Sequence, residues 1–231
     1  MGWLGRLLTS SIGQKLIMSL TGVFLILFLT VHLIGNLQLL IDDQGMAFNE
    51  YADFMGHNTL VQIISKGNFF FILLHGAVGL YLWVVNRAAR GGQKYAVNNV
   101  RAASTHPGFA RNMAILGTIM LVFILIHLFQ FWLQVQIDNV APVSYGDGVE
   151  INNLYEKVTA TFVNPGFVIF YVISMIVISF HLWHGFQSAF QTLGLNHQKY
   201  TPIIQFLGKA YSILIPLGFA IIPIVFYLKH A

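Results

Sequence analysis

Residues 16–41 read LIMSLTGVFLILFLTVHLIGNLQLLI, with no charged side chain between Lys15 and Asp42. A helix of about 20 apolar residues crosses the hydrocarbon core of a bilayer, so this run is long enough to span a membrane. It is too long for a cleavable signal peptide and lacks a small-residue cleavage site. We therefore expect a membrane-spanning helix here.

Four similar apolar blocks follow along the chain. Of the 231 residues, 56% are hydrophobic and only 9% are charged, and the mean hydropathy is +0.70. A soluble domain averages about 25% charged residues, so this chain cannot cover itself with a polar surface. The pattern predicts an all-α integral membrane bundle that forms a single transmembrane domain over residues 1–231. Its five expected transmembrane helices are 13–40, 66–87, 111–137, 164–190 and 203–228.

The charged residues indicate how the bundle is oriented. If the N-terminus is cytoplasmic, most basic residues lie inside and all eight acidic residues lie outside. This distribution satisfies the positive-inside rule and predicts a cytoplasmic N-terminus with the C-terminus outside. The net charge of +4 then reflects topology rather than nucleic-acid binding, although a basic inner face also suits a soluble partner or anionic lipid. The inside residues are Arg6, Lys15, Arg87, Arg90, Lys94, Arg101, Arg111, Lys199 and Lys209; the outside basic residues are Lys66, Lys157 and Lys229.

One imidazole lies deep within each of the first four apolar blocks. These are His32, His75, His127 and His181, and His184 is a second candidate in the fourth block. Ionisable side chains inside a membrane are costly and mark functional sites by default. A single membrane histidine is equally well explained as a neutral side chain bonded to a neighbouring helix. One per helix on four consecutive helices favours a function.

The depths of the four histidines sort them into two pairs. At 1.5 Å per residue, His32 and His127 lie about 25 Å and about 24 Å from the inner face. His75 and His181 lie about 18 Å and about 15 Å from it. The order defines an outer pair (His32 with His127) and an inner pair (His75 with His181). A haem between two helices needs axial ligands at nearly equal depth, and both pairs meet this requirement.

Haem is the metal group that these residues favour. Two neutral imidazoles are a common axial ligand set for an electron-transfer haem, whereas zinc or a di-metal site needs three or more converging ligands. The chain has no cysteine, which excludes disulfides, thiolate-held iron–sulfur clusters and a CxxCH site within it. Glycines at matched spacings would make room for a porphyrin, or they are simply frequent at membrane helix interfaces. They are Gly22 and Gly117, each ten residues before an outer histidine, and Gly79 and Gly185, one turn after the inner histidines.

Short motifs around these histidines resemble a known family. They are His32-Leu-Ile-Gly-Asn36, His75-Gly-Ala-Val-Gly79-Leu, His127, and His181-Leu-Trp-His184-Gly185 followed by 188–194, SAFQTLG. The chain resembles the cytochrome b membrane anchor of succinate:quinone oxidoreductases, in the five-helix, single-polypeptide, two-haem form. In that family one histidine from each of the first four helices ligates haem, and helix I pairs with III and II with IV. The family's His-x-x-x-Gly pattern selects His181 and leaves His184 unmatched.

The resemblance implies a division of labour within a larger complex. A flavoprotein subunit oxidises succinate, an iron–sulfur subunit passes the electrons on, and this chain anchors both at the cytoplasmic face of a bacterial inner membrane. Its cofactors would be two haem b groups, and its substrate would be menaquinone or another quinone. The chain itself has no dicarboxylate site, so its part in the reaction would be electron transfer and quinone reduction.

Other residues bear on the mechanism. Some fumarate-reducing members carry a glutamate immediately before the helix IV ligand for proton transfer, and this chain has Phe180 there. Glu50 loosely matches the family's quinone-site glutamate, or it is a solvated loop carboxylate. Lys15 and Ser19 would flank a second quinone pocket at the inner end, or Lys15 extends its ammonium group to the lipid–water interface.

Three other functions remain open at this point. The chain would also suit a quinol:fumarate reductase anchor working in reverse, or the cytochrome b of a membrane hydrogenase or formate dehydrogenase. The helix IV motif argues against the latter two. A histidine-lined transporter without a cofactor is the third possibility, and an absorption spectrum separates it from the haem proteins.

Overall fold

The fold was analysed on a computed structural model that describes residues 2–90, 107–146 and 148–231. Within these ranges, the membrane helices are α2 (Ser11–Leu37), α4 (Thr59–Arg90), α5 (Pro107–His127), α8 (Pro165–Thr192) and α9 (Thr201–His230). A 3₁₀ turn η1 (Gln38–Leu40) extends α2, and a π-helical segment η2 (Leu128–Trp132) and α6 (Leu133–Gln136) extend α5. The shorter elements are α1 (Trp3–Thr9), α3 (Met46–His57), α7 (Leu154–Phe162) and the strands β1 (Pro142–Val143) and β2 (Ile151–Asn152).

The five expected transmembrane helices are confirmed. Five helices in the described ranges are long and apolar enough to cross a membrane. The second begins at Thr59 rather than near 66, because the side chain of Asn58 caps it by accepting a hydrogen bond from the Val61 backbone N–H at 3.1 Å. Lys66 therefore lies inside α4. Part of the charge and loop assignment lies outside the described residues, namely Lys94, Arg101, His106 and Asp147.

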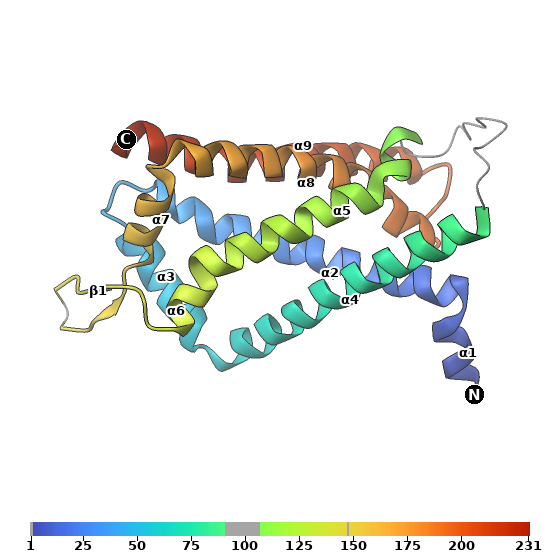
Figure 1. Ribbon diagram of the computed structural model, residues 1–231, viewed down its shortest axis with the longest axis horizontal. Coiled ribbons are helices and arrows are strands. Elements are labelled where there is room, and N and C mark those ends of the chain that lie inside the picture. Colours follow the sequence, from blue (N-terminus) through green and yellow to red (C-terminus); the bar gives the residue numbers. More distant parts are fainter. Residues whose placement is uncertain (1, 91–106, 147) are drawn as a thin grey trace.

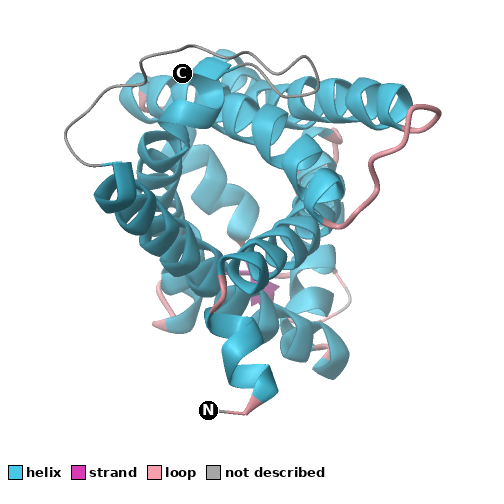
Figure 2. Cartoon of the chain, turned by 90° about the vertical axis from the view of Figure 1, so that its right-hand side faces the viewer, coloured by secondary structure: helices cyan, strands magenta, loops and turns pink. Residues whose placement is uncertain are grey.

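Four helices form a ring, and the fifth covers one side of it. Helix α2 packs against α4 and α8, and α5 packs against the same two helices, so α2 lies opposite α5 and α4 opposite α8. Figure 2 views this arrangement along the bundle. Helix α9 packs against α8 and α2, and the chain termini lie at opposite ends of the bundle (Figure 1).

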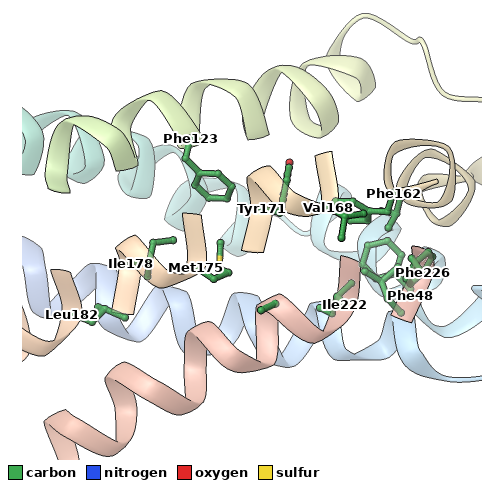
Figure 3. Close-up of a cluster of buried hydrophobic side chains, with 13 residues drawn as sticks. Phe48, Phe123, Phe162, Val168, Tyr171, Met175, Ile178, Leu182, Ile222 and Phe226 are labelled. Atoms are coloured by element: carbon green, nitrogen blue, oxygen red, sulfur yellow. The ribbon is translucent and has the colours of Figure 1, made fainter. Parts of the chain in front are cut away.

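The hydrophobic core follows one face of α8. Its buried residues recur at intervals of three and four, which is the spacing of one helix face, and they pack against α9, α7 and α5 (Figure 3). They are Val168, Tyr171, Met175, Ile178 and Leu182. Helix α9 approaches closely through Gly208 and Gly218, where an added Cβ would lie 2.8 Å from Phe186 and 2.9 Å from Leu33. Small residues of this kind let membrane helices pack together.

The outward faces of the helices are apolar. Leu27, Leu73, Ile115, Ile169 and Leu214 are each more than half exposed, and each belongs to a different membrane helix. Soluble monomers rarely expose continuous apolar surface on this scale. These faces contact the lipid of a bilayer, so the chain is a multi-pass membrane protein.

A cap of short elements closes the end of the bundle that carries α3, α7 and the two strands. None of these short elements was among the helices expected from the sequence. Asn49 of α3 is fully buried and joins three of them. Its amide nitrogen donates to the Tyr145 hydroxyl at 2.8 Å and to Asn153 Oδ1 at 3.0 Å, and its Oδ1 accepts from the Tyr155 backbone N–H at 2.9 Å. One polar side chain thus fixes α3 to the strand connection and to α7.

Candidate functional site

The four histidines meet in two pairs inside the helix ring. The imidazole of His32 in α2 lies edge-on to that of His127 in α5, with ring centres 5.9 Å apart. The rings of His75 in α4 and His181 in α8 have centres 6.3 Å apart. These are the pairs expected from depth. In each pair the two helices are diagonal in the ring, so the side chains meet across its centre.

Two glycines mark the level of the inner pair on the other two helices. An added Cβ at Gly22 of α2 would lie 3.4 Å from Cε1 of His75, and one at Gly117 of α5 would lie 3.9 Å from Cε1 of His181. Ten residues separate Gly22 from His32 on α2, which places the outer pair about 15 Å further along the bundle. At the inner level, two helices therefore contribute imidazoles and the two others contribute glycines.

Gly79 and Gly185, the other two glycines expected near haem, do not face the histidine rings. An added Cβ at Gly79 would lie 3.1 Å from the Met18 side chain, so Gly79 faces α2. At Gly185 an added Cβ would meet no atom within 4 Å. Gly79 therefore serves helix packing in this structure, whereas Gly185 leaves open space beside the helix one turn after His181.

Aromatic rings surround the outer pair. His32 stacks on Phe28 at 5.3 Å between ring centres and lies 5.6 Å from Phe219 of α9. His127 lies 5.8 Å from Phe123 and 5.3 Å from Phe131. The environment of both imidazoles is thus apolar apart from the partners of their ring nitrogens.

Three of the four histidines have a polar partner at ring nitrogen Nδ1. The Thr21 hydroxyl oxygen lies 3.0 Å from Nδ1 of His75, and the Tyr171 hydroxyl oxygen lies 3.3 Å from Nδ1 of His127. The Asn36 amide nitrogen lies 3.3 Å from Nδ1 of His32. The hydroxyl oxygens of Thr21 and Tyr171 can accept an Nδ1 proton from His75 and His127, which leaves Nε2 of these two rings free for a ligand. The Asn36 amide can only donate, so it does not hold His32 in this form.

His181 differs from the other three. Its Nδ1 is buried and has no hydrogen-bond partner within the described ranges. A buried ring nitrogen without a partner is costly and points to a group that completes the site. His184 follows one turn later on α8 and is half-buried. Their separation of three residues turns the two rings about 60° apart around the helix, so His184 is not aligned with His181 toward His75.

The donor set fits a metal held by two imidazoles. Two metal–nitrogen bonds of about 2 Å, with about 1.1 Å from each nitrogen to its ring centre, would separate the ring centres by about 6 Å. The observed 5.9 Å and 6.3 Å agree with this separation. In the part of the chain that the structure describes, no three His, Asp or Glu side chains converge to hold a metal ion. Each pair could therefore hold a metal between its two imidazoles, as axial histidines do in a haem protein.

The residues expected at quinone sites lie at opposite ends of the bundle. Glu50 lines a cavity of about 520 Å³ in the cap, together with Asp53, His57, Tyr145 and other residues of α3 and the strand connection. Lys15 is exposed near the start of α2. Ser19 is buried, but its hydroxyl donates to the Lys15 backbone carbonyl at 2.9 Å. Of the expected quinone-site residues, Glu50 is thus placed at a cavity.

Three further residues of the site, Thr21, Gln130 and Tyr171, are absent from the sequence expectations. Tyr171 donates a hydrogen bond from its hydroxyl to Oε1 of Gln130 at 2.7 Å, beside His127. Tyr171 precedes His181 by ten residues, as Gly22 precedes His32 and Gly117 precedes His127, and this shared register is the signal that would have found it. Gln130 offers no such signal, because its position depends on the π-helical segment η2.

No protein-family model, no curated protein and no solved structure matches this chain. The functional interpretation therefore depends on the geometry of the two histidine pairs and on the short motifs around them.

Proposed function

We propose that this chain is the di-haem cytochrome b membrane anchor of a succinate dehydrogenase, which works with menaquinone or another quinone. The observation that supports it best is the pair of diagonal imidazole contacts, with ring centres 5.9 Å and 6.3 Å apart at two levels of one helix ring. A transporter lined by histidines has no need for matched pairs at this separation. The motif resemblance then selects among haem-bearing anchors.

Each side chain has a role in this proposal. His32 and His127 would hold one haem through their Nε2 atoms, and His75 and His181 would hold the other. Gly22 and Gly117 would leave room beside the inner porphyrin, and the aromatic side chains around the outer pair would exclude water. Bound at these positions, haem b supplies one-electron oxidation and reduction. His184 would support the inner site without ligating iron.

The charge distribution supports the orientation that we propose. The end formed by α1, the end of α8 and the start of α9 carries Arg6, Lys15, Lys199 and Lys209 (Figure 1). The opposite cap carries seven of the acidic residues, which are Asp42, Asp43, Glu50, Asp53, Asp138, Glu150 and Glu156. Under the positive-inside rule the basic end faces the cytoplasm, where the flavoprotein and iron–sulfur subunits would dock.

The cavity in the cap would bind the quinone substrate. Glu50 lines the 520 Å³ cavity there, which lies within the usual size range of small-molecule sites. A carboxylate at such a pocket would exchange protons with a quinone oxygen.

Phe180, which precedes His181 and is 39% exposed, has no group that carries a proton.

Co-expression with candidate flavoprotein and iron–sulfur subunits, followed by affinity purification through this chain, tests the proposal. We expect both subunits to co-purify, the reduced-minus-oxidised spectrum to show b haem, and succinate to reduce a menaquinone analogue. A preparation without reducible haem would refute the haem assignment and favour a transporter. Haem together with hydrogenase or formate dehydrogenase subunits, and no succinate oxidation, would reassign the anchor. Faster fumarate reduction than succinate oxidation would reverse the proposed direction.

A further inference from the structure

The Tyr171 hydroxyl lies between an outer-pair histidine and the π-helical segment η2. Its oxygen is 3.3 Å from Nδ1 of His127 and 2.7 Å from Oε1 of Gln130. Gln130 belongs to η2, which begins at the residue after His127. π-Helical turns are rare and occur frequently at functional sites. Here the turn places an amide oxygen beside the phenol that contacts the histidine.

The hydrogen-bond directions in this group are determined by its chemistry. A phenol has one proton to donate, and Tyr171 donates it to the Gln130 carbonyl oxygen. The Tyr171 oxygen can then only accept from His127, so the proton of that imidazole lies on Nδ1. Its Nε2 is left with a free lone pair, which is the form that binds a metal.

The Tyr171 ring is held firmly enough for such a role. It is only 6% exposed. Phe123 and Phe162 meet it edge-on, with ring centres 5.2 Å and 5.0 Å away, and Figure 3 shows the three residues together. A phenol fixed by aromatic packing keeps its oxygen in place and restricts the rotation of the imidazole that it contacts.

We infer that Tyr171 and Gln130 are positioning residues that fix the Nδ1–H form and the ring orientation of His127, and thereby lower the reduction potential of the group that this histidine holds. A ligating histidine that donates its second N–H becomes a more basic ligand, which favours the oxidised metal. The inference rests on the proposed function, because it assumes a haem at the outer pair. At the inner pair, Thr21 holds His75 in the corresponding way: its hydroxyl donates to the Ile17 backbone carbonyl at 2.8 Å, and its oxygen lies 3.0 Å from Nδ1 of His75. Nδ1 of His181 has no such partner among the described residues.

The test uses the purified full chain and reads the midpoint potentials of both haems by redox titration, with haem content measured separately. Tyr171→Phe keeps the aromatic packing but removes the acceptor, so the outer haem's potential should rise while the inner one stays unchanged. Gln130→Leu should also raise the outer haem's potential, but by less, since the Tyr171 oxygen can still accept a hydrogen bond from His127. The double variant should raise the outer haem's potential no further than Tyr171→Phe alone, because Gln130 acts on His127 only through Tyr171. Tyr211→Phe is the matched control: Tyr211 donates instead to the Ile26 carbonyl at 2.6 Å, and both potentials should stay unchanged.

Each outcome decides the inference. Unchanged outer potentials in Tyr171→Phe would overturn it, as would an equal shift in Tyr211→Phe. Loss of the outer haem alone from Tyr171→Phe would support it, because the retained inner haem reports an intact fold. If Tyr171→Phe loses both haems, the outer haem of Gln130→Leu is measured instead. A raised potential or selective loss of that haem supports the inference, and an unchanged potential overturns it. Wild-type protein without haem would refute the proposed function itself, and this result is distinct from every variant outcome.

Discussion

Gly22 of α2 faces the imidazole of His75 in α4, and a Cβ at position 22 would lie 3.4 Å from Cε1 of that ring. This contact joins two helices at the level of the inner pair. A methyl group at position 22 would meet the ring at ordinary van der Waals distance.

Substitutions at position 22 should therefore have graded effects on the inner haem. Gly22→Ala adds an ordinary van der Waals contact and should keep both haems. Gly22→Leu would occupy the space beside His75, so we expect selective loss of the inner haem, measured by redox titration of the purified protein. Gly67→Leu is the control, because an added Cβ at Gly67 in α4 meets no atom within 4 Å. Equal haem content in Gly22→Leu and Gly67→Leu would contradict the expected crowding.

Replacing single histidines should separate the two haems. His32→Ala or His127→Ala should remove chiefly the outer haem, and His75→Ala or His181→Ala chiefly the inner one, because each pair meets across its own diagonal. Potentiometric titration identifies the haem that remains. If His32→Ala and His75→Ala lose the same haem, the pairing is wrong.

His184 should influence the inner site without ligating iron. It lies one turn from His181 and points about 60° away from it around the helix. His184→Ala should keep both haems but slow quinone reduction or shift the inner haem's potential, as measured by steady-state assay and titration. The opposite pattern would show that the ligand was misassigned: no inner haem in His184→Ala, and a normal one in His181→Ala.

The cap should depend on Asn49. Asn49→Ala removes three hydrogen bonds and leaves the partly buried Tyr155 N–H without its acceptor, which should lower the free energy of unfolding by about 3 kcal/mol. Thermal unfolding in detergent measures this loss. Met46→Ala changes an exposed side chain of the same helix and should unfold close to the wild-type temperature. Equal unfolding temperatures for the two variants would exclude the joining role of Asn49.

The sequence predicted the spans and the histidine pairs because both follow from simple regularities. Long apolar blocks without charged residues indicate the membrane helices. Because the rise per residue of a helix is constant, the position of each histidine in its block gives its depth in the bundle. The same rise relates Gly22 to His32 and Gly117 to His127. None of these relations depends on how individual side chains rotate.

The cap and the surroundings of His127 could not be predicted in this way. Helices α3 and α7 are short and mixed in composition, so hydropathy does not distinguish them from loops. They are fixed by cross-chain contacts such as Asn49 with Tyr145 and Asn153. The Tyr171–Gln130 contact depends on the π-helical segment η2, which changes the direction of the side chains after His127. A local change of helix type leaves no mark in residue composition.

The number of haems bound by the purified chain decides whether the two imidazole pairs are haem sites. Pyridine haemochrome analysis, referred to protein concentration, gives the number of non-covalent b haems per chain. Two diagonal imidazole pairs predict two haems per chain, both low-spin and both extracted by acidified organic solvent. One haem per chain, or none, would contradict the account.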